Sequence, residues 1–98
     1  MLCDELNILR DAINTFGVDH QLDMAIEEMS ELTKEVCKIK RNEEGSEYGS
    51  LDALSEEMAD VIIMLEQLKI IFSNRLKVEE WVEKKMTRLA NLVKDGDE

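Results

Sequence analysis

Apolar residues recur along most of this chain at intervals of three and four, the spacing of one face of an α-helix. The first such stretch stops at Gly17, a residue type that often ends helices because it tolerates a positive φ. The third is preceded by Ser50, a suitable N-cap, and the fourth by a polar break at Ser73 and Asn74. We therefore predict four helices: one ending at Phe16, one from after Asp19 to about Lys40, one over residues 51–72, and one that follows the break at Ser73 and Asn74 and runs through Val78 to Val93.

Between the second and third predicted helices, residues 41–50 show no periodicity and include Asn42, Gly45 and Gly49, which is typical of a loop. No proline interrupts the helical stretches. A chain of 98 residues is long enough for one domain. We expect a single all-α domain over residues 1–98, folded as a compact bundle of about four helices.

The centre of the third predicted helix, residues 58–65 (MADVIIML), is apolar on every side except at Asp60. Such a helix must be buried around most of its circumference. A domain of this size buries only about 60–65% of its unfolded surface, and three short helices leave part of this one uncovered. We therefore expect a homo-oligomer.

Two pairs of acidic residues lie at a spacing of three on the second and third predicted helices. Glu28 and Glu31 share one helix face, and so do Glu57 and Asp60. Like charges at this spacing repel by roughly 0.2–0.5 kcal/mol per pair, and surface helices usually offset this with nearby cations. Only Glu31 has a cation within helical reach, Lys34.

Two interpretations of these acids remain open from their spacing. Carboxylates in apolar surroundings without counter-charge must take up a proton or meet a cation, and a divalent metal between the two helices would satisfy all four. The other interpretation is an ordinary solvated acidic face. Glu31, which lies nearly opposite the apolar stripe of its helix, fits that face, whereas Asp60 has no polar face to join.

The overall charge limits the possible partners. The chain has 23 acidic and 12 basic side chains and a formal charge of -11, which repels nucleic-acid backbones and anionic lipid surfaces. We therefore expect no nucleic-acid polymer as a partner. A free nucleotide remains possible if a metal ion lies between the carboxylates and its phosphates.

Cysteine and histidine are too few for a structural zinc site, because the chain has only Cys3, Cys37 and His20. The two cysteines form no C-x-x-C motif, and we expect a reduced, cytoplasmic protein. The N-terminal residues contain no apolar signal region, and no later run approaches the roughly 18 apolar residues of a membrane span. We expect a protein that is neither secreted nor held in a membrane.

The two acidic motifs and their flanking residues resemble those of a known family, the MazG-like branch of the all-α nucleoside triphosphate pyrophosphohydrolases. That family has E-x-x-E on one helix and E-x-x-D on the next. The matching segments are residues 16–22 (FGVDHQL), 25–32 (AIEEMSEL) and 54–61 (LSEEMADV). The resemblance extends from about Phe16 to Leu89.

The resemblance implies a helical protomer that forms a homodimer or a dimer of dimers. It implies hydrolysis of a (d)NTP to a (d)NMP and pyrophosphate, with Mg²⁺ as cofactor and Mn²⁺ as a substitute. A carboxylate beside the metal would accept a proton from the attacking water. The implied residues are the metal ligands Glu28, Glu31, Glu57 and Asp60 and, by a looser match, the phosphate-binding Lys85 and Arg88. The candidate catalytic bases are the neighbouring carboxylates Glu27 and Glu56, and spacing does not decide between them.

Two alternative functions are also compatible with the sequence. One is a specialised enzyme with the same motifs, such as a phosphoribosyl-ATP pyrophosphohydrolase. The other is a non-catalytic helical protein whose acidic face binds a basic partner, and it predicts no effect of magnesium beyond that of salt in general.

Overall fold

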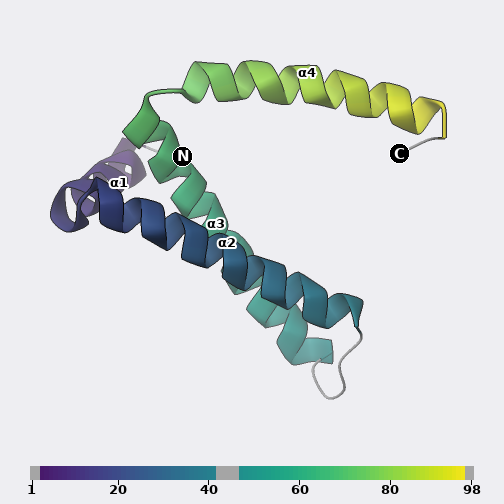
Figure 1. Ribbon diagram of the computed structural model, residues 1–98, viewed down its shortest axis with the longest axis horizontal. Helices are drawn as coiled ribbons and strands as arrows, with labels where there is room; N and C mark the ends of the chain where they lie inside the picture. Colours follow the sequence, from purple (N-terminus) through teal and green to yellow (C-terminus); the bar gives the residue numbers. More distant parts are fainter. Residues whose placement is uncertain (1–2, 42–46, 97–98) are drawn as a thin grey trace.

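Four helices follow one another along the chain, and the described residues, 3–41 and 47–96, contain no strand (Figure 1). This computed structural model confirms the all-α class and the four helices predicted from the sequence. None of the described helices combines the length and the apolar character that a membrane span requires. The helices are α1 (Cys3–Phe16), α2 (Val18–Lys40), α3 (Glu47–Phe72) and α4 (Arg75–Lys94).

Gly17 lies between α1 and α2 and is the N-cap residue of α2. Its φ of +91° lies in the region that favours glycine. Its N–H donates to the carbonyl oxygen of Ile13 (2.9 Å), and its own carbonyl accepts the N–H of Gln21 (3.1 Å). These two hydrogen bonds satisfy backbone N–H and carbonyl groups at the end of α1 and the start of α2. The predicted boundary at Gly17 is confirmed.

α3 begins earlier than predicted. Its first residue is Glu47, so Ser50 lies inside the helix and does not cap it. The first turn of a helix tolerates poor helix formers such as Gly49, because its N–H groups lack intrahelical partners in any case. The other predicted loop residues, 42–46, lie outside the described part of the chain.

The break between α3 and α4 lies where the sequence predicts it. Ser73 has a φ of 49°, and its N–H donates to the carbonyl of Ile70 (3.3 Å). The N–H of Asn74 donates to the carbonyl of Lys69 (3.3 Å), which completes a Schellman-type helix end. The chain then turns sharply into α4.

α4 extends away from the other helices (Figure 1). Most contacts between helices join α2 to α3, and α4 contacts only α3. The apolar core contains Leu9, Ala25 and Met64, whereas no residue of α4 is buried. The radius of gyration is 16.6 Å, against about 13 Å for a compact domain of this length. A single chain is therefore more open than the compact bundle predicted.

Candidate metal centre

Two glutamines fix the alignment of α2 against α3. Gln21 and Gln67 are both buried, and Gln21 Nε2 donates to Gln67 Oε1 at 2.7 Å. Gln21 Oε1 lies 2.8 Å from His20 Nδ1, and Gln67 Nε2 donates to Met64 Sδ at 3.6 Å. Because a buried amide without partners destabilises the fold, this pair favours the one register in which the two side chains meet.

The same register places the acidic motifs opposite each other. Glu28 lies seven residues after the α2 glutamine, and Asp60 lies seven residues before the α3 glutamine. Residues seven apart lie on nearly the same helix face, so in an antiparallel pair these two acids meet two turns beyond the glutamines. One turn further along, Glu31 and Glu57 occupy opposing positions.

Three carboxylates from the two helices converge at this point: Glu28 from α2, and Glu57 and Asp60 from α3. One oxygen from each carboxylate lies within 4.8 Å of the other two, and all three residues are half-buried. In the described part of the chain, no ion pair joins any of them to a lysine or arginine. We refer to these three residues as the acidic cluster.

The carboxyl group of Glu28 holds a proton more tightly than usual. Partial burial raises its pKa, and the negative charges of Asp60 and Glu57 raise it further. A hydrogen bond between the Glu28 and Asp60 carboxyls acts in the same direction, because such a bond requires a proton on one of the two groups. The cluster therefore favours positive charge, either a proton or a cation.

Glu57 presents an oxygen without a partner. Its Oε2 atom is shielded from solvent and accepts no hydrogen bond within the described residues. Desolvation raises the pKa of Glu57, and the charges of Asp60 and Glu31 add to this. A shielded carboxylate oxygen without a donor is unfavourable, and a bound ion is one ordinary reason for its presence.

The remaining predicted acids surround the cluster. Glu31, Glu27 and Glu56 are exposed, and Glu31 does not belong to the converging group. The charge of Glu27 raises the pKa of Glu28, and the charges of Glu31 and Glu56 raise that of Glu57. The structure thus brings together three of the four predicted metal ligands and leaves the fourth and both predicted bases nearby.

The predicted phosphate-binding residues lie elsewhere. Lys85 and Arg88 are exposed on α4, and Lys85 Nζ lies 5.8 Å from the ring centre of Trp81. Because α4 has no contact with α2, a single chain does not bring these cations to the acidic cluster. Trp81, which lies on the apolar stripe of α4, is 58% exposed.

Sequence reasoning did not identify Gln21 and Gln67 as part of this arrangement. The sequence contains one signal for them, because each lies seven residues from a motif acid. Their burial, which is unusual for a polar side chain, is known only from the structure.

Comparison of the chain with protein-family models, curated proteins and solved structures finds no match. The acidic cluster is therefore the feature of this chain that points to a function.

Proposed function

We propose that this protein is a Mg²⁺-dependent nucleotide pyrophosphohydrolase that converts a (d)NTP and water to a (d)NMP and pyrophosphate. The observation that carries the proposal is the convergence of Glu28, Glu57 and Asp60 from two helices, with no cation paired to them in the described part of the chain. The resemblance of the two motifs to those of MazG-like enzymes supports the same reaction.

The donor set of the acidic cluster fits a magnesium ion. Mg²⁺ prefers oxygen ligands and is usually shared between one or two carboxylates, waters and substrate phosphates. Glu28, Glu57 and Asp60 offer such oxygens, and we propose Glu31 as the fourth ligand. A cation at this position gives the shielded Oε2 of Glu57 a partner and replaces the proton that the raised pKa of Glu28 otherwise favours.

The acids around the cluster have a separate role in this proposal. Bound Mg²⁺ would supply positive charge between the carboxylates and the phosphates and would lower the pKa of the attacking water. Glu27 or Glu56 accepts a proton from that water while the water oxygen bonds to the phosphorus of the α- or the β-phosphate. The anhydride bond between these two phosphates breaks, and the bridging oxygen stays with the phosphate that was not attacked.

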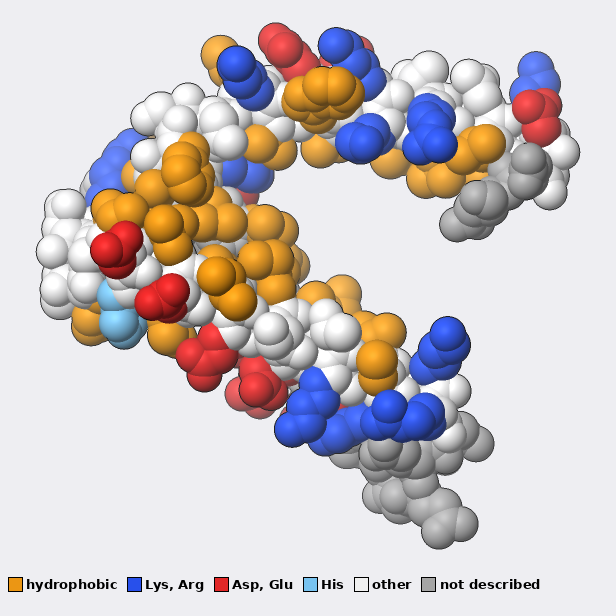
Figure 2. All heavy atoms as spheres, in the orientation of Figure 1, with side chains coloured by type: hydrophobic (Ala, Val, Ile, Leu, Met, Phe, Trp, Pro, Cys, Tyr) orange, Lys and Arg blue, Asp and Glu red, His pale blue; other side chains and the backbone are white. Residues whose placement is uncertain are grey.

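We also propose that the active form is a homodimer or a dimer of dimers. The hollow between α3 and α4 is lined mostly by apolar side chains, seen in orange in Figure 2, and these include Ile62, Phe72 and Val82. Exposed apolar patches of this kind usually mark interfaces. Lys85 and Arg88 contact substrate phosphates only in an assembly that places an α4 helix against an α2–α3 pair.

Pyrophosphate release is the direct test. The purified protein is incubated with a panel of canonical and modified NTPs and dNTPs and with phosphoribosyl-ATP, in magnesium and in chelator. The proposal expects magnesium-dependent release from at least one nucleotide. A preference for phosphoribosyl-ATP would select the specialised enzyme, whereas no release from any substrate would favour the non-catalytic acidic binding protein.

A further inference from the structure

A second pocket, of about 340 Å³, lies between α1, the end of α3 and the start of α4. It is separate from the acidic cluster, because Lys69 in its wall is nine residues beyond Asp60 on α3, about 13.5 Å along the helix axis. We call it the basic pocket. Its lining residues are Leu6, Arg10, Lys69, Ile70, Ser73 and Arg75.

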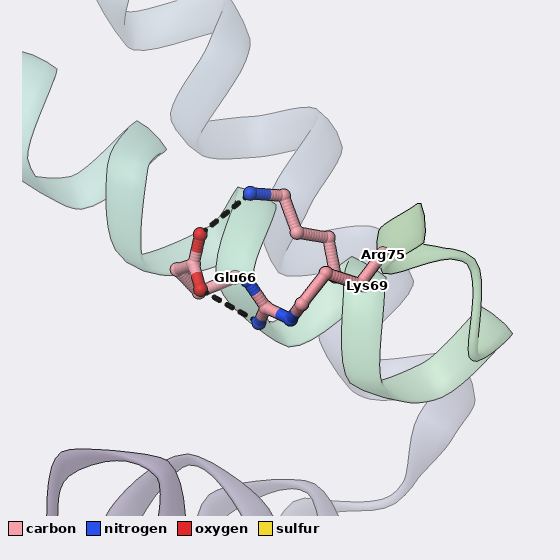
Figure 3. Close-up of polar contacts among 3 residues, drawn as sticks. All are labelled: Glu66, Lys69 and Arg75. Atoms are coloured by element: carbon pink, nitrogen blue, oxygen red, sulfur yellow. Dashed lines mark hydrogen bonds and ion pairs between the residues drawn. The ribbon is translucent and has the colours of Figure 1, made fainter. Parts of the chain in front are cut away.

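The basic pocket concentrates positive charge in a protein whose formal charge is -11. Glu66 pairs with two of its cations: Oε2 lies 2.7 Å from Lys69 Nζ, and Oε1 lies 2.8 Å from Arg75 Nη2 (Figure 3). These hydrogen bonds hold the pKa of Glu66 below its ordinary value, so the carboxylate stays ionised at neutral pH. Three cations and one carboxylate leave a local charge of +2.

Hydrogen-bond donors remain available after Glu66 is satisfied. An ammonium group has three N–H donors and a guanidinium has five, and Glu66 takes one from each of its two partners. Arg10 forms no hydrogen bond or ion pair with another described residue. Ser73 adds a hydroxyl group. One carboxylate therefore leaves most of the donors in this pocket unused.

We propose that the basic pocket binds a phosphate dianion. A dianion brings the local charge of +2 to zero, and its several oxygen atoms can accept hydrogen bonds from all three cations. Arginine side chains match the oxygens of phosphate with two parallel hydrogen bonds, which favours phosphate over a monovalent ion such as chloride. The proposal requires neither the acidic cluster nor a metal and is independent of the proposed reaction.

The test is a ¹H–¹⁵N NMR titration of the full chain in chelator, at ionic strength held constant with sodium chloride. One arm uses inorganic phosphate and the other AMP, which present the same dianion from different sources. Arg10→Gln removes the cation that has no carboxylate partner among the described residues. Lys77→Gln is the matched control, because Lys77 is exposed on α4 outside the pocket and its substitution changes the total charge equally.

We expect saturable shifts of the amide signals of Arg10, Ser73 and Arg75, and affinity about tenfold weaker in Arg10→Gln, the scale of one charged hydrogen bond. Lys77→Gln keeps the original affinity. A response in one arm only assigns the pocket to that source of phosphate. Shifts that sodium chloride reproduces, or equal weakening by both substitutions, overturn the proposal. Arg10→Lys keeps the charge and the exposed position but loses the paired N–H donors of the guanidinium group. We expect this variant to bind phosphate with intermediate affinity.

Discussion

Asp60 belongs to the acidic cluster and is the only polar side chain within residues 58–65. Asp60→Asn keeps the shape of the side chain but removes its charge. We expect magnesium-dependent pyrophosphate release to fall by at least about 10²-fold, the effect of losing one major electrostatic group in an active site. Asp52→Asn is the matched control, because Asp52 is an exposed acid of the same helix outside the cluster, and it should retain full turnover.

Stability measured in chelator separates a catalytic Asp60 from a structural one. Removal of one negative charge relieves repulsion with Glu28 and Glu57, so the melting temperature of Asp60→Asn should hold or rise when no metal is present. A variant that melts earlier but turns over substrate at the original rate per folded molecule would contradict the proposed role.

The raised pKa values of Glu28 and Glu57 predict a pH dependence of stability. A carboxyl whose pKa is higher in the folded than in the unfolded state binds more protons when the protein is folded. Its contribution to the stability of the folded state is therefore complete below the ordinary pKa of 4.5. That contribution is lost as the pH rises through the pKa of the folded state. In chelator, the melting temperature should therefore fall as the pH rises from about 4.5 towards neutrality.

The whole protein also gains negative charge over this pH range, which can lower the melting temperature by itself. The variants Asp60→Asn and Asp52→Asn separate the effect of the acidic cluster from this general one. Asp60→Asn should show a shallower fall than the original chain, since both pKa values depend on the Asp60 charge. Asp52→Asn should show the original slope. Identical slopes in all three proteins, measured by thermal melts at several pH values, would show that the cluster does not cause the effect.

At the level of individual residues, the sequence predicts which acids lack a nearby cation, because helical spacing alone determines the local neighbours of Glu57 and Asp60. It does not predict that Glu28 joins them more closely than Glu31 does. That difference depends on how far each side chain turns towards the opposing helix, which is set by packing between helices and not by the spacing within one of them.

At the level of helices, a metal bound to Glu28, Glu57 and Asp60 would connect α2 to α3. We expect Mg²⁺ or Mn²⁺ to raise the melting temperature, by an amount equivalent to about 2.7 kcal/mol when the metal is at a hundredfold its dissociation constant. Asp60→Asn should lose most of this shift. The proposed site is wrong if sodium chloride at equal ionic strength reproduces the whole effect in the original chain.

Some helix boundaries can be predicted from the local sequence, and others cannot. Gly17 and the break at Ser73 were predictable, because an apolar stripe ends at each, Gly17 being a glycine and Ser73 the first of two polar residues. The φ of 49° at Ser73 was not predictable, since a serine rarely adopts a positive φ. The start of α3 at Glu47 was not, because Gly49 and Ser50 are typical of loops, yet the first helical turn accepts them. The pairing of Glu66 on α3 with Arg75 at the start of α4 was likewise not predictable, because the two residues lie on different helices and helical spacing does not bring them together.

At the level of the whole molecule, the open shape of one chain leads to a prediction about assembly. Light scattering at micromolar concentration should give a mass of at least two chains of 11.3 kDa. Val82→Lys places a charge in the apolar hollow between α3 and α4 and should shift the protein towards monomer. Thr87→Lys, an equal change of charge outside that hollow, should not. A monomeric original chain would refute this prediction.

The buried amide pair of Gln21 and Gln67 also has a consequence for conformational uniqueness. Two leucines at these positions would bury apolar surface and cost no unmet hydrogen bonds, so Gln21→Leu/Gln67→Leu should be at least as stable as the original chain. Leucines, however, pair equally well with other apolar residues a turn away, so α2 can slide along α3 into competing alignments. The double variant should therefore show more than one set of NMR signals for these helices, and only a fraction of its molecules would hold Glu28 opposite Asp60.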